Sequence, residues 1–171
     1  CNTVGSTIPR ESDAVLYTYA GPEIAVASTK AFLTQIIAAY PVGLYLAQVR
    51  GTKYGDEIAA IMGELAAIPP LIQRVLDDIE PIKQLAAKYA DHSSVLFLGR
   101  HVGYPVALEG ALKLKEISYI HSEAYAAGEL KHGTISLIEE GTLVVALATQ
   151  PALFEKTVSN MVECKSRGAY L

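Results

Sequence analysis

Hydrophobic residues recur every three to four positions over two long stretches of the chain, which is the period of an amphipathic helix. The first stretch begins at Ser28 or Thr29, whose hydroxyls can cap a helix N-terminus, and runs to about Val49 with a bend at Pro41. The second extends from Asp56 to Tyr89 and contains prolines that break it into shorter helices. Those prolines are Pro69, Pro70 and Pro81.

Short runs rich in Val, Leu, Tyr and Phe predict strands. They are Ala14–Thr18, Ser94–Leu98 and Leu143–Ala148, with a further strand starting at Ala169–Leu171. Gly99 follows one run directly and leads into a helix, and a second helix is expected over Ala152–Ser166. Strand, glycine turn and helix N-terminus form the crevice where open parallel α/β sheets hold ligands. We therefore expect a parallel α/β fold, with both ends of the chain cut inside secondary structure.

A charged stripe interrupts the apolar helix that follows Gly99. Glu109, Lys113 and Glu116 stand at i, i+4 and i+7, so they share one side of that helix. Apolar residues cover its other directions, which predicts burial on most sides. Two interpretations stay open for the stripe. It is either an ion pair on a solvated face, or an acid/base pair in which Lys113 steers the proton affinity of Glu116.

The composition of the chain argues against several kinds of binding partner. The 171 residues are 51% hydrophobic and 19% charged, with a net charge of -4 and no run of basic residues, so neither nucleic acid nor an anionic membrane is an expected partner. The longest apolar run, Ile36–Ala47, contains Pro41 and Gly43 and is shorter than the ~20 residues of a membrane span. It is interpreted as a buried helix, and no signal peptide is visible.

Only two cysteines occur, Cys1 and Cys164, and neither has a Cys or His at ligand spacing. We expect no metal or cofactor, and a reducing cytoplasmic compartment. Cys1 has two interpretations. It is the catalytic residue of an N-terminal-nucleophile amidotransferase, or it closes a strand that begins upstream; the loop-like residues that follow it favour the second.

Four segments of the chain resemble consecutive parts of the isomerase half of the glutamine–fructose-6-phosphate aminotransferase family, the glucosamine-6-phosphate synthases. The segments are CNTVGSTIPRESD, GPEIAVASTKAF, LGRHVGYPVALEGALKLKEISYIHSEAYAAGELKHG and KSRGAYL. They are long and specific, and the resemblance covers essentially the whole chain in order.

The resemblance implies two sugar-isomerase (SIS) domains, each a flavodoxin-like three-layer αβα fold around a parallel five-stranded sheet. In this chain, residues 1–52 would be the C-terminal part of the first SIS domain. Residues 53–90 would form a helical connector, and residues 91–171 the N-terminal part of the second SIS domain.

The resemblance also implies roles for individual residues. Glu116 would move a proton between the first and second carbons of the sugar, assisted by Lys113. His132 would help to open the sugar ring from across a dimer interface, whereas His121 is expected to be an ordinary core histidine. The side chains suit these roles. One carboxylate can move a proton between two neighbouring carbons, and a histidine titrates near neutral pH. The sugar wall would comprise Val26, Ala27 and Ser28.

The implied reaction converts fructose 6-phosphate and glutamine to glucosamine 6-phosphate and glutamate, the first step of hexosamine and UDP-N-acetylglucosamine biosynthesis. A glutaminase domain would supply the ammonia, and the enzyme would be a homodimer with shared active sites. Two alternatives stay open. One is another SIS aminosugar-phosphate isomerase or deglycase, and the other is a non-catalytic SIS module that senses sugar phosphates.

The chain departs from the family pattern in places. The loop that cradles the sugar phosphate would lie upstream of Cys1, and its counterpart at 148–151 lacks the hydroxyl cluster. Thr134 and Ser136 stand where the family has proline and a small apolar residue. The lysine that forms the imine would lie beyond Leu171. We therefore expect these 171 residues alone to be inactive.

Overall fold

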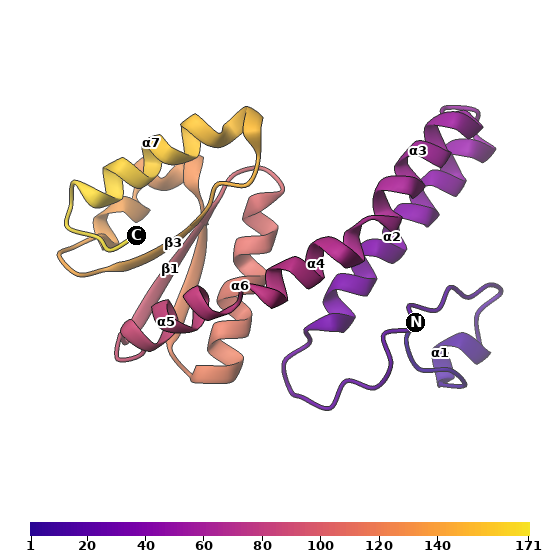
Figure 1. Ribbon diagram of the computed structural model, residues 1–171, viewed down its shortest axis with the longest axis horizontal. Coiled ribbons are helices and arrows are strands. Elements are labelled where there is room, and N and C mark those ends of the chain that lie inside the picture. The colour runs from indigo at the N-terminus through magenta and orange to yellow at the C-terminus, as the bar shows by residue number, and fades with distance from the viewer. The chain divides into compact units, whose positions relative to one another are not determined.

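The computed structural model describes residues 1–171, which divide into two compact units, Cys1–Lys83 and Gln84–Leu171. The first unit is helical, and the second contains a parallel sheet with helices (Figure 1). The division falls inside helix α5 (Glu80–Lys88), within the segment expected to connect two domains. The three-part division at residues 52 and 90 stays a prediction, and each unit is described by itself.

The first unit contains the helices expected from its periodicity, which are α2 (Lys30–Val49), α3 (Gly55–Ala66) and α4 (Ile68–Asp77). It also contains a short helix that was not expected, α1 (Thr7–Arg10), in the stretch after Cys1 that was interpreted as a loop. Helix α2 continues through Pro41, and α3 packs alongside it after a turn at Gly51, whose φ of +66° suits glycine (Figure 1). Pro69 and Pro70 lie in the first turn of α4, where a missing N–H costs no helical hydrogen bond.

The N-terminus of α2 is capped by a residue that the sequence did not indicate. The hydroxyls of Ser28 and Thr29 make no capping bond; instead the Glu23 carboxylate accepts from the backbone N–H of Ala31 at 3.2 Å and of Thr29 at 3.4 Å. A carboxylate caps more strongly than a hydroxyl because it also complements the helix dipole. Desolvation raises the pKa of Glu23, but these hydrogen bonds and Lys30 outweigh it, so the pKa is lowered.

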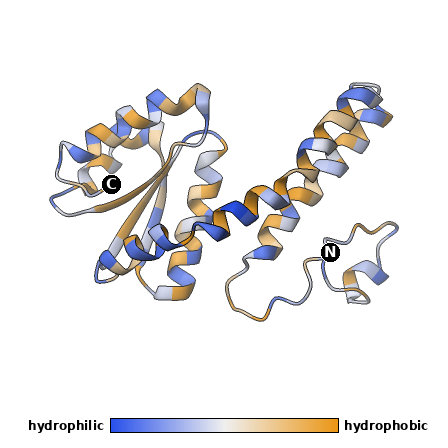
Figure 2. Ribbon diagram, viewed as in Figure 1, coloured by the Kyte–Doolittle hydropathy of each residue, from blue (hydrophilic) through white to orange (hydrophobic).

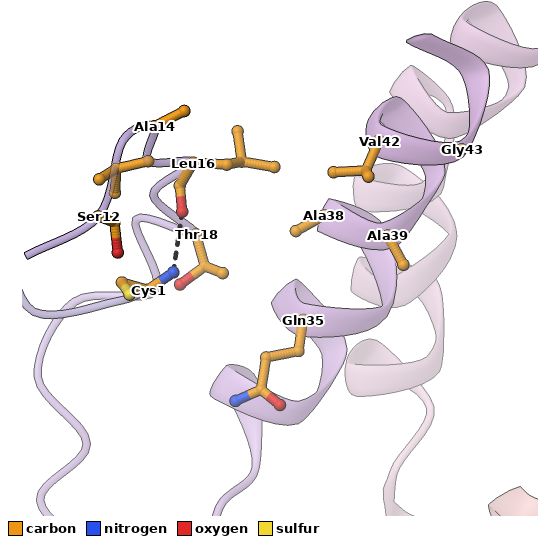
Figure 3. Close-up of a pocket in the computed structure, with 11 residues that line it drawn as sticks. Cys1, Ser12, Ala14, Leu16, Thr18, Gln35, Ala38, Ala39, Val42 and Gly43 are labelled. Carbon is orange, nitrogen blue, oxygen red and sulfur yellow. Dashed lines mark hydrogen bonds between the residues drawn. The ribbon is translucent and has the colours of Figure 1, made fainter. Parts of the chain in front are cut away.

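The expected strand at Ala14–Thr18 is not formed. This segment has no strand partner in its unit and bonds to the first two residues of the chain. The Thr18 N–H donates to the Cys1 carbonyl at 2.9 Å, and the Cys1 amino group donates to the Leu16 carbonyl at 2.8 Å. The Thr18 hydroxyl donates to Oδ1 of Asn2 at 3.1 Å. Between this segment and α2 lies a groove of about 590 Å³. Figure 3 shows Ala38 and Val42 of α2 facing the groove from one side.

Helix α2 is not the buried helix that its composition predicted, because Leu44 is its only buried residue. By length and composition alone, Lys30–Val49 and Gly55–Asp77 would be long and apolar enough to cross a membrane. The second of these spans is two separate helices, α3 and α4, with two prolines near its middle. Core helices of soluble proteins pass the same test, so this finding carries little weight.

The second unit confirms the predicted parallel α/β sheet. Strands β1 (Ser94–Gly99), β2 (His121–Ala126) and β3 (Leu143–Leu147) are all parallel and lie in the order β2-β1-β3. Strand β2 was not expected, because its polar residues hide the strand pattern. The expected strand at the C-terminus is reduced to one parallel bridge between Tyr170 and Leu143, which places it beyond β3 as in a doubly wound sheet.

Helices lie on both sides of this sheet. Helix α6 (Gly103–Ser118) joins β1 to β2 and packs on both strands, while α7 (Phe154–Lys165) follows β3 on the other side (Figure 1). Short 3-10 helices, η1 (Ala127–His132), η2 (Thr134–Leu137) and η3 (Pro151–Leu153), connect the remaining elements. Right-handed crossovers that run in opposite directions from a strand lie on opposite faces, which explains the two layers.

The core of the second unit lies between the sheet and the α7 layer. Its buried members include Leu98, Leu130, Val144 and Cys164, all at most 2% exposed. Figure 2 shows hydrophobic colours along the strands and mixed colours along α7, as expected for a central sheet with a half-exposed helix.

Helix α6 is buried on one face only, which corrects the expectation of burial on most sides. Small residues, Gly103, Ala107 and Ala111, face the sheet, whereas Leu112 and Ile117 are exposed. The helix ends at Tyr119, a non-glycine residue in the left-handed region with φ of +61°. Ser118 supports this end by donating to the Leu114 carbonyl and accepting from the Ile120 N–H.

The turn from β1 into α6 leaves no space for a side chain at Gly99. A Cβ there would lie 2.6 Å from the backbone nitrogen of Tyr104 and still closer to the carbonyl of Gly103. We predict that Gly99→Ala lowers the free energy of unfolding by about 3 kcal/mol, because backbone atoms must move. Chemical denaturation followed by circular dichroism measures it.

Gly103→Ala is the matched control, because a Cβ at Gly103 would meet only ordinary contacts of 3.6 Å or more. It should change stability by no more than about 1 kcal/mol. Equal losses for the two variants would contradict the steric explanation.

Candidate active site

Three charged side chains of α6 form one connected cluster, here called the charged triplet. The Lys113 ammonium lies 2.6 Å from Oε2 of Glu116 and 3.3 Å from Oε1 of Glu109. The side chains of Lys113, Glu109 and Glu116 are 20%, 21% and 27% exposed. The triplet is therefore neither a freely solvated ion pair nor a fully buried one, so water and a small ligand can both reach it.

The triplet fixes the protonation state of its lysine. The hydrogen bond to Glu116 is the main cause that raises the pKa of Lys113; desolvation opposes it, and the hydrogen bond and charge of Glu109 add to it. Lys113 therefore stays an ammonium ion at neutral pH and can donate hydrogen bonds but cannot accept a proton. The cluster contains one ammonium group and two carboxylates, and only the carboxylates can act as a base.

The sheet holds α6 so that the triplet faces away from the core. Ala111 is 2% exposed, and its carbonyl accepts a hydrogen bond of 2.7 Å from the buried hydroxyl of Ser122 on β2. Gly110 lies against the ring of Phe97, where a Cβ would be only 3.2 Å from the ring. These small residues bring the helix close to the sheet, which leaves long side chains at Glu109, Lys113 and Glu116 on the outer side.

His132 lies far from the triplet within this chain. It ends η1 at the carboxyl end of β2, its side chain is 76% exposed, and its nearest ionic neighbour is Glu129 at 3.8 Å. Glu116 lies just before the amino end of β2, and a six-residue strand spans roughly 20 Å. The chain does not bring His132 to Glu116, so a role in the same site requires a second copy and stays a prediction.

The expected sugar wall lies in the first unit, in the loop before α2. Ala27 is 4% exposed, Val26 is 92% exposed and Ser28 is intermediate. The hydroxyl of Ser28 makes no hydrogen bond within the chain, since the helix cap is supplied by Glu23. The ligand role of these three residues stays a prediction.

Strand β2 carries a polar row that sequence reasoning missed. His121, Glu123 and Tyr125 alternate along the strand, on the side opposite to Ser122, and the Tyr125 hydroxyl donates to Glu123. Nε2 of His121 lies 3.6 Å from Glu123, and His121 is 67% exposed, which corrects its expected place in the core. The alternation of polar residues would have revealed this row had the strand been recognised.

The two cysteines are unpaired and differ in access. Cys1 is exposed. Its amino group, which would have to act as the base if Cys1 were an N-terminal nucleophile, donates a hydrogen bond to the Leu16 carbonyl. Cys164 is buried in the core, and burial raises the pKa of its thiol, with a further contribution from Glu163. Neither cysteine joins a group of three or more His, Cys, Asp or Glu side chains that could hold a metal ion.

Comparison with known proteins agrees with this fold. Residues 88–171 match the SIS domain family. The glutamine–fructose-6-phosphate aminotransferases [isomerizing] of Streptomyces coelicolor and Corynebacterium glutamicum are each 62% identical over 99% of this chain. The C-terminal domain of glucosamine-fructose-6-phosphate aminotransferase from Francisella tularensis superposes with a TM-score of 0.95 and 44% identity over the whole chain.

The parallel sheet and the SIS match define the class of residues 88–171, which form an α/β domain of the SIS type. The identities are more specific: over essentially its whole length the chain is similar to part of the isomerizing glutamine–fructose-6-phosphate aminotransferases, and its fold matches the C-terminal domain of one of them. It spans 28% of the length of the two curated relatives and 48% of the solved chain.

The hydrogen bond between Tyr125 and Glu123 generates a pH prediction. Acceptance by the carboxylate, followed by desolvation and the carboxylate charge, raises the pKa of Tyr125 to about 12. We predict that Glu123→Gln lowers this pKa towards the ordinary value of about 10. Phenolate absorbance during an alkaline titration measures it, with Tyr125→Phe subtracted to isolate the one ring.

Since the folded pKa of Tyr125 lies above its unfolded value, this bond stabilises the fold fully below pH about 10 and ceases to do so as the pH rises to about 12. Glu139→Gln, an exposed charge removal, is the control and should leave the titration unchanged. An unchanged titration in Glu123→Gln would contradict the assignment.

Proposed function

We propose that this chain is part of an enzyme that converts fructose 6-phosphate and glutamine to glucosamine 6-phosphate and glutamate. The observation that carries the proposal is the half-buried bond of 2.6 Å between Lys113 and Glu116 on α6. The 62% identity to isomerizing aminotransferases supports the reaction. Because the chain spans 28% of those relatives, the glutaminase domain would belong to the part that it does not cover.

In this proposal Glu116 carries the proton. Turning a ketose imine into an aldose amine requires that a proton leave the first carbon and return to the second, and one carboxylate placed over one face can do both. The Lys113 ammonium donates a charge-assisted hydrogen bond that holds the Glu116 carboxylate in one orientation. Glu109 anchors the other side of Lys113 at 3.3 Å and acts as a positioning residue.

Ring opening is assigned to His132, acting in the active site of a partner subunit. The side chain of His132 is 76% exposed, so it is available to a second copy, and its place at the opposite end of β2 from Glu116 supports a role in the site of the partner. Val26, Ala27 and Ser28 would form the wall that contacts the sugar. A homodimer with shared sites follows from this assignment.

The proposal also assigns a cellular compartment and a source of ammonia, and it is favoured over two other functions. Two unpaired thiols suit the cytoplasm, and the ammonia would come from glutamine through the glutaminase domain. A non-catalytic sugar-phosphate sensor would not need the connected triplet, and a deglycase is disfavoured by the similarity to aminotransferases over the whole chain. The 171 residues alone are proposed to be inactive.

The role of Glu116 is tested in the full-length enzyme. Glu116→Gln keeps the size of the side chain but removes the base, so glucosamine 6-phosphate synthesis should fall by at least about a hundredfold while glutamine hydrolysis continues. Product formation and glutamate release are measured together. Glu80→Gln, an exposed carboxylate, is the control with normal synthesis. Synthesis near the wild-type rate in Glu116→Gln would overturn the role.

The shared site is tested by subunit mixing. Glu116→Gln and His132→Asn enzymes should each be inactive, yet co-expressed they should recover about a quarter of wild-type activity, because half of the dimers are mixed and each holds one intact site. Synthesis by the co-expressed dimers, purified together without separating the mixed form, is the measurement. If the mixture is as inactive as the two single variants, His132 does not act across the interface.

A further inference from the structure

A small basic pocket lies at the carboxyl end of the sheet, in the segments that follow the three parallel strands. Arg100 follows β1, Gly128 and Lys131 belong to η1 after β2, and the remaining lining residues belong to α7 after β3. The α7 residues are Lys156, Ser159, Asn160 and Glu163. The pocket has a volume of about 260 Å³, below the usual range for drug-sized ligands, so its size suits a small ion or head group.

The walls of the pocket are fixed by a continuous polar network. Nε and Nη2 of Arg100 donate to Oδ1 of Asn160 at 3.1 and 2.9 Å, and Asn160 is only 5% exposed. The Asn160 amide donates in turn to Glu163 at 3.5 Å, and Glu163 forms an ion pair of 2.8 Å with Lys131. Each group in this row holds the next, so the arginine is oriented before any ligand arrives.

Donors remain unused after this network is complete. Nη1 of Arg100 lies beside Gly128, where a Cβ would be 3.2 Å from it, so a side chain here would push the guanidinium aside by a few tenths of an ångström. Lys156 makes no ion pair, and the Ser159 hydroxyl makes no hydrogen bond. Three cations and one carboxylate give the pocket a net charge of two positive units, in a chain whose net charge is -4.

We propose that this pocket binds the phosphate group of a small phosphorylated metabolite. Unused N–H and O–H donors around two net positive charges are complementary to a phosphate dianion, and arginine is suited to its oxygens. The carboxyl end of a parallel sheet is where such folds hold ligands. The pocket is separate from the charged triplet, because α6 runs from Gly103 to Glu116 between them, roughly 20 Å. The proposal does not depend on the role of Glu116.

Binding is tested by NMR on the isotopically labelled 171-residue chain. Inorganic phosphate should shift the backbone amides of Gly128 and Ser159 saturably in the millimolar range, whereas sodium chloride at equal ionic strength should not. Lys156→Gln should weaken binding by about tenfold or more, since one charged contact is lost. Lys165→Gln, the same change at the far end of α7, is the matched control and should bind normally.

A second variant approaches the pocket from another element. Gly128→Ala crowds Nη1 of Arg100 and should also weaken phosphate binding, while unchanged amide signals in β1 show that the fold is kept. Titration with fructose 6-phosphate shows which part of a ligand the pocket recognises. If fructose 6-phosphate binds more tightly than inorganic phosphate, the pocket recognises a sugar phosphate; if the two bind equally, it recognises the phosphate group alone. The proposal is overturned by absence of saturable shifts, or by shifts that persist unchanged in both Lys156→Gln and Gly128→Ala.

Discussion

The second unit depends on one constraint, the course of strand β1 through the centre of the sheet and its immediate turn at Gly99. Strand β1 pairs with β2 on one side and β3 on the other, so both neighbours take their register from it. The turn brings the backbone of Gly103 and Tyr104 against Gly99 so closely that only glycine fits. This contact sets where α6 begins, and therefore where every side chain along α6 lies.

The same arrangement separates two charged regions of opposite sign. Helix α6 carries the Lys113 triplet to the amino end of the sheet, with two carboxylates for one ammonium. Arg100, which directly follows β1, stays at the carboxyl end, where the chain returns in η1 and α7 with two lysines. One strand thus positions the charged triplet at one end of the sheet and the basic pocket at the other.

Sequence reasoning predicted the elements that local patterns determine and missed those that depend on tertiary contacts. The helical periods and the apolar strands β1 and β3 follow from short-range sequence, and the charged triplet follows from helical spacing. Strand β2 is polar on its surface and was missed, and Ala14–Thr18 has a strand-like sequence without a partner strand in its unit. The basic pocket joins Arg100, Lys131 and Lys156 from distant segments, so no run of basic residues could reveal it.

Because the two cysteines differ in access to solvent, the rate at which each thiol is labelled reports on local opening of the fold. A thiol-blocking reagent reaches the exposed Cys1 directly, whereas the Cys164 side chain, sealed between α7 and the sheet, can react only when that layer opens. The rate of the slow phase of labelling therefore measures how often α7 separates from the strands. Because α7 supplies Lys156, Ser159 and Asn160, each such opening also takes the basic pocket apart, and the interval between openings is the lifetime of the pocket.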